Sequence, residues 1–335
     1  MKKVIYIIIL TILIVGLNVG KTQSMEKIKL MFAWIPYGKH TPFYVSLDKG
    51  FWKEEGLDVT LIRGSGSGDT IKKVAAGLAE FGKAGAEVVA TARDEGVKVK
   101  IIGAYHDRGL AVIHTLKKSN IKTLKDLEGK TMAAAPTDSC KVIFPALCAI
   151  NNIDAEKINW VNITGPAKIP ALVTEKVDAT CTLFTEDPSY EDAAKKVGKE
   201  LVRLMYSDHG LDIYSISIIT TDDMIKNRPE VVKRFLKGMY RGFAWSIEHP
   251  EEAVDIFEKH VPEVDKNLAK KHFKIMLDHF LTPTAYEKGM GYIREDKMKA
   301  TRDIALKYLT KTEKSIPLDD LYTNAFLPGI FPPKR

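Results

Sequence analysis

The feature that most constrains the fold is a strand that runs through a turn into a helix between Lys29 and Gly50. Leu30 to Trp34 is apolar and typical of a strand, Pro36 to Gly38 of a turn, and Thr41-Pro42 of a helix start. In an open α/β sheet, ligands bind where strand ends meet helix N-termini. We therefore expect ligand contacts here rather than core packing alone. The candidate residues are Trp34, Tyr37, His40, Thr41 and Tyr44.

Similar junctions recur along the chain. The strand Gly56 to Ile62 ends in a glycine-serine turn that contains Ser65 and Ser67. Such a turn can hold an anion on its backbone N–H groups, although it lacks the lysine and the spacing of a nucleotide phosphate loop. A second short strand enters a helix through small residues and places Lys83 and Glu87 at the same edge. The remaining candidate ligand residues, near the ends of later strands, are Tyr105, Asp138, Ser139, Cys140, Glu186 and Tyr214.

The order of the elements predicts an α/β protein with two lobes. A chain of 335 residues with 45% hydrophobic and 28% charged residues is long enough for two domains with separate cores. The first lobe is expected at residues 27–115 and the second at residues 116–215, and a return strand and helices at residues 216–335 complete the first. Two chain crossings would leave a hinge and a cleft between the lobes, where closure can enclose a ligand.

Helical patterns dominate the last third of the chain. Pro229 is expected at the first position of a long helix that ends near His249, and further helices are expected at 250–260, 266–280 and 296–309. These helices would cover the first lobe.

The N-terminus predicts export. Met1-Lys-Lys precedes an apolar run from Val4 to Leu17, which matches a signal peptide and is short for a membrane span. We expect residues 1–24 to be a signal peptide, either cleaved after Ser24 or kept as an anchor, and an extracytoplasmic mature protein. No cysteine follows the apolar run, so we do not expect a lipid anchor. Without residues 1–24 the formal charge falls from +7 to +4 and no basic block remains, which argues against nucleic-acid binding.

The cysteines do not predict a disulfide framework or a metal site. Cys140 and Cys148 would lie about 12 Å apart on one helix, at about 1.5 Å of rise per residue, which is too far for a bond. With Cys181 the chain has three cysteines, an odd number that does not suggest a set of paired cysteines.

Several motifs resemble a known family. The motifs that show the resemblance are Trp34-x-Pro36 with His40-Thr-Pro-Phe-Tyr-Val45, Lys49 to Val59, Glu80-Phe-Gly82, Val177-Asp-Ala179, Asn227 to Phe235 and Asp320 to Asn324. Over nearly all of the mature part, the chain resembles solute-binding proteins of ATP-driven importers, in the branch that includes pyrimidine synthases of thiamine biosynthesis and is similar to sulfonate- and nitrate-binding proteins.

The resemblance implies a two-lobed periplasmic-binding-protein-like fold of type II, with two crossover strands. It implies a substrate-binding component that works with a membrane permease and an ATPase subunit. The implied ligand is a small planar heterocycle, either a thiamine pyrimidine precursor or a flavin-like compound, held by aromatic stacking and lobe closure. A sulfonate, nitrate or aromatic acid remains an alternative ligand.

Lys83 raises the alternative of an enzyme. Lys83 stands at the position where the pyrimidine synthases of this family carry the lysine that holds pyridoxal phosphate, as the resemblance implies. The synthases also have a histidine four residues later, where this chain has Glu87, and a cysteine-rich run, where this chain has Ser207 to Tyr214. We expect Glu87 to pair with Lys83 and to keep its ammonium charged, which disfavours imine formation. The sequence therefore predicts a binding protein that is not an enzyme and uses no cofactor.

Overall fold

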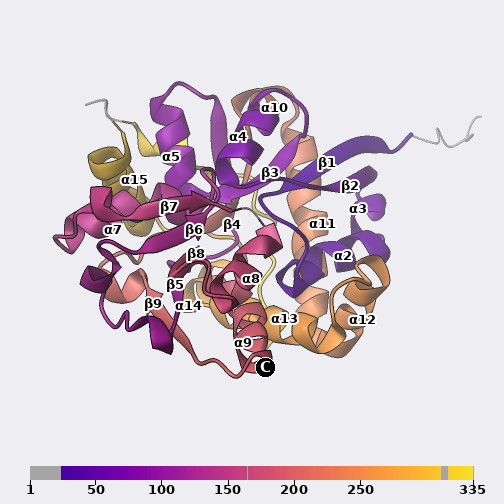
Figure 1. Ribbon diagram of the computed structural model, residues 1–335. Helices are drawn as coiled ribbons and strands as arrows, with labels where there is room; N and C mark the ends of the chain where they lie inside the picture. The colour runs from indigo at the N-terminus through magenta and orange to yellow at the C-terminus, as the bar shows by residue number, and fades with distance from the viewer. Residues whose placement is uncertain (1–23, 164, 311–315, 335) are drawn as a thin grey trace, which may run out of the picture.

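The computed structural model describes residues 24–163, 165–310 and 316–334 of the chain. These residues form two five-stranded sheets, each with helices on both faces (Figure 1). The predicted export segment lies outside the described residues, apart from Ser24. Among the helices described, none has the length and apolar composition needed to cross a membrane.

The first sheet has the strand order β2-β1-β3-β10-β4. Its strands are β1 (Glu26–Phe32), β2 (Leu57–Arg63), β3 (Phe81–Gly85), β4 (Val99–Ala104) and β10 (Ile216–Thr221). β1 pairs in parallel with β2 and β3, whereas β10 lies antiparallel between β3 and β4. A strand from late in the chain therefore occupies an interior position of the first sheet.

The second sheet has the strand order β7-β6-β8-β5-β9. Its strands are β5 (Ala111–Leu116), β6 (Thr131–Ala134), β7 (Asn159–Asn162), β8 (Ala179–Leu183) and β9 (Leu201–Met205). The sequence pattern groups residues up to 115 with the first lobe, but β5 pairs with β8 and β9 in the second sheet. The crossing therefore falls before β5, in the turn that contains His106. The boundaries of the two lobes otherwise stay a prediction.

Helices cover both sheets as the alternation of apolar residues requires. In β1, Leu30 and Phe32 face a core that includes α2 and α11, while Met31 faces the core of α4 and α5 on the opposite side. The helices are α2 (Thr41–Asp48), α3 (Phe51–Glu54), α4 (Ser67–Ala75), α5 (Ala86–Asp94), α6 (Ser139–Val142), α7 (Phe144–Ile150), α8 (Lys168–Val173), α9 (Asp187–Lys196), α10 (Asp222–Asn227), α11 (Pro229–Glu248), α12 (Pro250–His260), α13 (Lys266–Phe280), α14 (Pro283–Lys288), α15 (Glu295–Leu309) and α16 (Leu318–Leu321).

α15 joins the two parts of the molecule. It packs against α5 beside the first sheet and against α7 beside the second. Met298 belongs to the core of the first sheet, whereas Ile304 and Tyr308 pack on the core of the second. Thr301 Oγ1 accepts a 3.0 Å hydrogen bond from the N–H of Tyr214, just before the chain returns to the first sheet. α15 therefore supports the return crossing.

Candidate functional site

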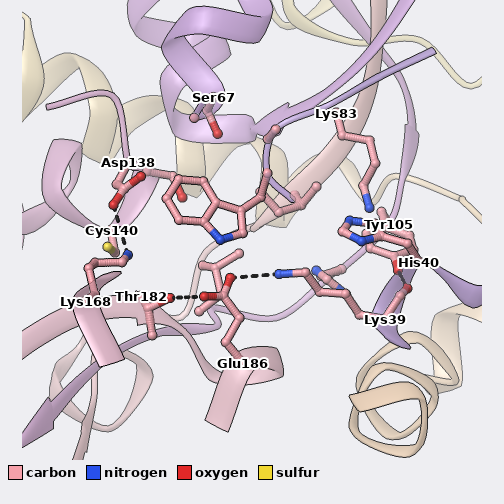
Figure 2. A pocket seen from close by; sticks show the side chains of 17 residues that line it. Lys39, His40, Ser67, Lys83, Tyr105, Asp138, Cys140, Lys168, Thr182 and Glu186 are labelled. Carbon is pink, nitrogen blue, oxygen red and sulfur yellow. Dashed lines mark hydrogen bonds and ion pairs between the residues drawn. The ribbon is translucent and has the colours of Figure 1, made fainter. Parts of the chain in front are cut away.

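A cavity of about 50 Å³ lies between the two sheets (Figure 2). The side of the first sheet supplies Ala33, Trp34, Lys39, His40, Gly66, Ser67, Lys83, Tyr105, His106 and Ile216. The side of the second sheet supplies Asp138, Ser139, Cys140, Lys168, Thr182, Leu183 and Glu186. Most of these residues stand at strand ends or in the first turn of a helix, as expected for an α/β ligand site.

A buried ion pair crosses the cavity. Lys39 Nζ, from the short 3₁₀ turn Gly38–His40 that precedes α2, lies 2.8 Å from Glu186 Oε1. Thr182 donates a 2.6 Å hydrogen bond to the other oxygen of Glu186. Burial acts to raise the pKa of Glu186, but Lys39 and Lys168 outweigh it and lower the pKa below its usual value. Figure 2 shows the Lys39 and Glu186 side chains pointing toward each other. The pair ties the two sides of the cleft together.

A second buried ion pair lies within the second-sheet side. Lys168 Nζ is 3.0 Å from Asp138 Oδ2 and donates a further hydrogen bond to the Cys181 carbonyl. Asp138 Oδ2 also accepts from the N–H of Ala135. Burial raises the pKa of Asp138, and the neighbouring Lys168 ammonium opposes this rise. The Lys168 ammonium also lies 4.9 Å from the centre of the Trp34 ring, a cation–π contact between the two sides of the cavity.

Lys83 lies in an aromatic enclosure on the first-sheet side. Its amine is 3.7 Å from the ring centre of Tyr105 and 4.6 Å from that of Phe43. No ion pair of Lys83 occurs within the part of the chain that the structure describes. Burial, and then the charge of Lys39, lower the pKa of Lys83 well below its usual value. The expected ion pair with Glu87 was wrong, because Lys83 lies inside strand β3 and does not open the helix.

His40 and His106 complete this side of the cavity. The His40 ring stacks on Phe32 with 4.4 Å between ring centres, and its Nδ1 accepts from the N–H of Tyr37. Burial, followed by the charge of Lys83, lowers the pKa of both histidines well below 6.5. Within the described ranges, both ring nitrogens of His106 and Trp34 Nε1 are buried without a hydrogen-bond partner.

Three of the expected residues of the 29–50 stretch lie outside the cavity lining. Tyr37 is buried against the His272 ring, and Tyr44 packs in the core of the first sheet against Phe257. Thr41 is the first residue of α2 rather than its N-cap, because a 3₁₀ turn runs directly into the helix and His40 takes the cap position. The Tyr37 and Tyr44 rings thus pack against other aromatic rings.

Ser65, Glu87 and Tyr214 also lie outside the lining. Ser65 is exposed, and its carbonyl accepts a 2.6 Å hydrogen bond from Thr137 Oγ1 across the cleft. The Glu87 carboxyl lies close to Gly85 at the start of α5, and burial raises its pKa to about 8. Tyr214 is fully buried, and its hydroxyl accepts from the N–H of Arg294.

Four lining residues with polar side chains were missed, namely Lys39, His106, Lys168 and Thr182. Lys39 lies between Tyr37 and His40, which were both candidate residues, so its place in this turn was the available signal. Lys168 opens an otherwise apolar helix, and a lone lysine at such a position was the available signal. Nothing local distinguishes Thr182 from other strand threonines.

The structure corrects the analysis of the cysteines. Cys140, which lines the cavity at the start of α6, forms a disulfide with Cys181 of β8, with 5.9 Å between their Cα atoms. The sequence comparison of Cys140 with Cys148 missed this bond, because the two partners lie 41 residues apart and meet only in the folded sheet. Cys148 is a buried free thiol. Among the described residues, no group of metal-ligating side chains is present.

Solved structures identify the class of fold. The chain matches a Candida albicans protein described as having the generic periplasmic-binding-protein fold, with a TM-score of 0.68, 16% identity and coverage of 89% of this chain and 96% of the other. It also matches the alkanesulfonate-binding protein SsuA from Xanthomonas axonopodis, with a TM-score of 0.63, 14% identity and coverage of 85% and 94%. The protein therefore has the periplasmic-binding-protein fold, as expected.

The family follows from the sequence match. The NMT1/THI5-like family model matches residues 38–253, and the chain belongs to this family. A riboflavin-binding protein of Chloroflexus aurantiacus is 22% identical over 91% of this chain and 87% of its own length. A formylaminopyrimidine-binding protein of Halalkalibacterium halodurans is 21% identical over 78% and 80% of the two chains. The resemblance inferred from the motifs is confirmed.

One expectation is contradicted by the relatives. A Legionella pneumophila protein that is 26% identical over 90% of this chain and 93% of its own length is named as 4-amino-5-hydroxymethyl-2-methylpyrimidine phosphate synthase. Relatives from Saccharomyces cerevisiae carry the same activity in their names. The expectation that the chain is not an enzyme is therefore wrong as an inference from its family, since the family contains both binding proteins and enzymes.

Proposed function

We propose that the protein is the extracytoplasmic substrate-binding component of an ATP-driven importer. In this role it encloses a small planar heterocycle, such as a thiamine pyrimidine precursor or a flavin-like compound, between its two sheets. Its partners would be a membrane permease and an ATPase subunit. The observation that carries the proposal is the cavity whose walls come from both sheets and are joined by the Lys39–Glu186 pair.

Contacts that cross the cleft support enclosure of a ligand. Besides Lys39 and Glu186, Ser189 Oγ of α9 lies 2.9 Å from His272 Nε2 of α13. Gly66 lies so close to Thr137 that an added Cβ would meet Thr137 Oγ1 at 2.5 Å. These contacts form only when the two sides are together, so they describe a closed state.

The cavity favours a compact ligand. Its volume of about 50 Å³ is far below the roughly 300–1,000 Å³ of typical ligand sites. The Trp34 and Tyr105 rings offer apolar surface, while Trp34 Nε1 and the His106 ring offer polar atoms. Both a one-ring pyrimidine and a three-ring flavin exceed this volume, and the pyrimidine needs less opening of the cleft.

The disulfide supports export independently of the N-terminal segment. Bonds such as Cys140–Cys181 persist in oxidising compartments and are rare in the cytosol. An extracytoplasmic location accounts for both the apolar N-terminal run and the disulfide.

Native mass spectrometry of protein purified from its own cells tests the proposal. We expect a bound small molecule that contains a planar heterocycle, and calorimetry with that compound should give one site per chain. Protein that carries no small molecule, and that binds neither riboflavin nor hydroxymethylpyrimidine in calorimetry, would contradict the proposal.

A second candidate function rests on Lys83. Its desolvated amine is the form that condenses with a carbonyl group, as lysine-dependent enzymes require. Pyridoxal phosphate would supply the carbonyl and an electron sink. The lining fits its aldehyde through Lys83 but does not fit its phosphate, since Lys39 and Lys168, the other lysines that line the cavity, are already paired with carboxylates.

Reductive labelling distinguishes this candidate. Incubation of the mature protein with pyridoxal phosphate and then borohydride should modify exposed lysines at random if the cavity serves binding alone. Stoichiometric labelling that is confined to Lys83, and that is absent in Lys83→Met, would establish the enzymatic candidate.

A further inference from the structure

We propose that the cleft selects uncharged ligands and excludes anions such as sulfonates and phosphate esters. This inference rests on the proposed binding function and narrows its ligand class. It separates the chain from the alkanesulfonate-binding protein that shares its fold.

Both carboxylates that line the cavity already have a lysine partner. Glu186 pairs with Lys39 at 2.8 Å, and Asp138 pairs with Lys168 at 3.0 Å. All four side chains are buried, with between 2% and 7% of each side chain exposed. The charges cancel within each pair, so neither pair presents a net charge to a ligand.

Lys83, the remaining lysine of the lining, is a poor partner for an anion. Its amine lies over the faces of Tyr105 and Phe43 rather than toward a carboxylate. Burial favours the neutral amine. The N-terminus of α4 offers little to an anion, because its first turn contains Asp69, whose carboxylate accepts from the N–H of Ser65.

The polar atoms that remain available are neutral. Trp34 Nε1 is a donor, and each of the two ring nitrogens of His106 can donate or accept in the neutral tautomers. His106 is 1% exposed and lines the cavity, so its unpartnered nitrogens point to hydrogen bonds with a bound molecule. Neutral ring nitrogens, amides and hydroxyls match these atoms.

An anion would have to break an existing pair. If the Lys39 ammonium turned to a sulfonate, Glu186 would lose its ion pair and keep only the hydrogen bond from Thr182 and the more distant charge of Lys168. A buried carboxylate without a counter-ion is strongly disfavoured. Glu186 therefore acts as an internal anion that occupies the lysine and keeps external anions out.

Substitution of Glu186 tests this directly. Benzenesulfonate and benzenesulfonamide have nearly the same shape and differ in charge, so they serve as matched probes in calorimetry and thermal-shift measurements. Glu186→Gln frees Lys39, and we expect it to bind benzenesulfonate roughly tenfold or more tightly than the wild type does. Glu200→Gln removes the same charge from an exposed pair with Lys117 and should leave benzenesulfonate binding unchanged.

Other outcomes overturn the inference. Wild-type protein that binds benzenesulfonate as tightly as Glu186→Gln does, or more tightly than benzenesulfonamide, would show that the pairs do not exclude anions. If Glu186→Gln does not fold, Asp138→Asn frees Lys168 and gives the same test. Tight anion binding by the wild type would leave the proposed binding function standing, whereas failure of the heterocycle titrations described above would remove that function.

Discussion

At the scale of single residues, two tryptophans separate function from stability. Trp34 is half-buried at the cavity with a free Nε1, whereas Trp52 is 1% exposed in the core and donates to the Phe235 carbonyl. We expect Trp34→Ala to weaken binding of the native ligand by about 1–3 kcal/mol, by analogy with stacked bases, and to leave the melting temperature nearly unchanged.

Trp52→Ala is the matched control. It should lower the free energy of unfolding by about 3–5 kcal/mol and leave affinity per folded molecule unchanged. Calorimetry and thermal melts on both variants give the comparison. A large loss of stability in Trp34→Ala would assign its ring to the core instead.

Glu87 predicts a pH dependence of stability. Its pKa of about 8 in the folded protein exceeds the 4.5 of an exposed glutamic acid because the carboxyl is desolvated. Between these values the folded state keeps a proton that the unfolded chain has lost, so the free energy of unfolding falls as the pH rises. Glu87→Gln removes this titration, and its melting temperature should fall less than that of the wild type from about pH 5 to about pH 8.

The buried histidines do not confound this test. The lowered pKa values of His40, His106 and His272 destabilise the folded state on acidification, the opposite direction, and both proteins retain them. Parallel stability curves for the two proteins would show that Glu87 is ionised in the folded state.

The predictability of the site from sequence differed from residue to residue. Strand ends identified Trp34, His40, Lys83, Asp138 and Glu186 as lining residues, because an α/β sheet collects ligands at that edge. Tyr44 and Tyr214 lie outside the lining, because an aromatic residue near a strand end packs inward as readily as outward. The candidate contacts of the lining stay predictions.

At the scale of elements, helices whose first residue is a proline or whose apolar residues recur at helical spacing were the most predictable. Proline at the first position fixed the starts of α11 and α12, and the predicted limits 266–280 match α13. β5 was misplaced because its pairing with β8 and β9 is set by residues about 65 to 90 positions later in the chain, which no local pattern reports.

The Cys140–Cys181 disulfide joins helix α6 to strand β8. We expect Cys140→Ser with Cys181→Ser to lower the free energy of unfolding by about 2–4 kcal/mol, since the bond closes a long loop. Urea unfolding measures this change. Cys148→Ser alters a cysteine outside the bond and should respond to a reductant as the wild type does.

Reductant supplies the second arm of that test. A reductant should lower the urea midpoint of the wild type and leave the double variant unchanged. Burial raises the pKa of the Cys148 thiol to about 12, so exchange with the bond is slow. An equal response of the double variant would show that the loss of stability comes from another source.

At the scale of the whole molecule, the Lys39–Glu186 pair should hold the closed state. Lys39→Met keeps most of the side-chain stem and leaves Glu186 buried without its cation. We expect the ligand affinity to fall by about 2–5 kcal/mol, mostly through faster dissociation. Small-angle scattering should show compaction of the wild type on ligand addition and less compaction of the variant.

An exposed lysine provides the control for closure. Lys117 pairs with Glu200 on the surface, with 69% of its side chain exposed, and Lys117→Met should close as the wild type does. Scattering curves of the wild type that superimpose with and without saturating ligand would contradict closure altogether.

The interior position of β10 has a consequence for the order in which the two sheets can form as the chain emerges. All strands of the second sheet lie between residues 111 and 205, whereas the first sheet lacks an interior strand until residues 216–221 emerge. A chain that emerges from its N-terminus can therefore complete the second sheet first, although the first sheet begins earlier. Until then β3 and β4 lack the strand that joins them, and each keeps an unpaired hydrophobic edge. These edges can pair with other chains until residues 216–221 cover them.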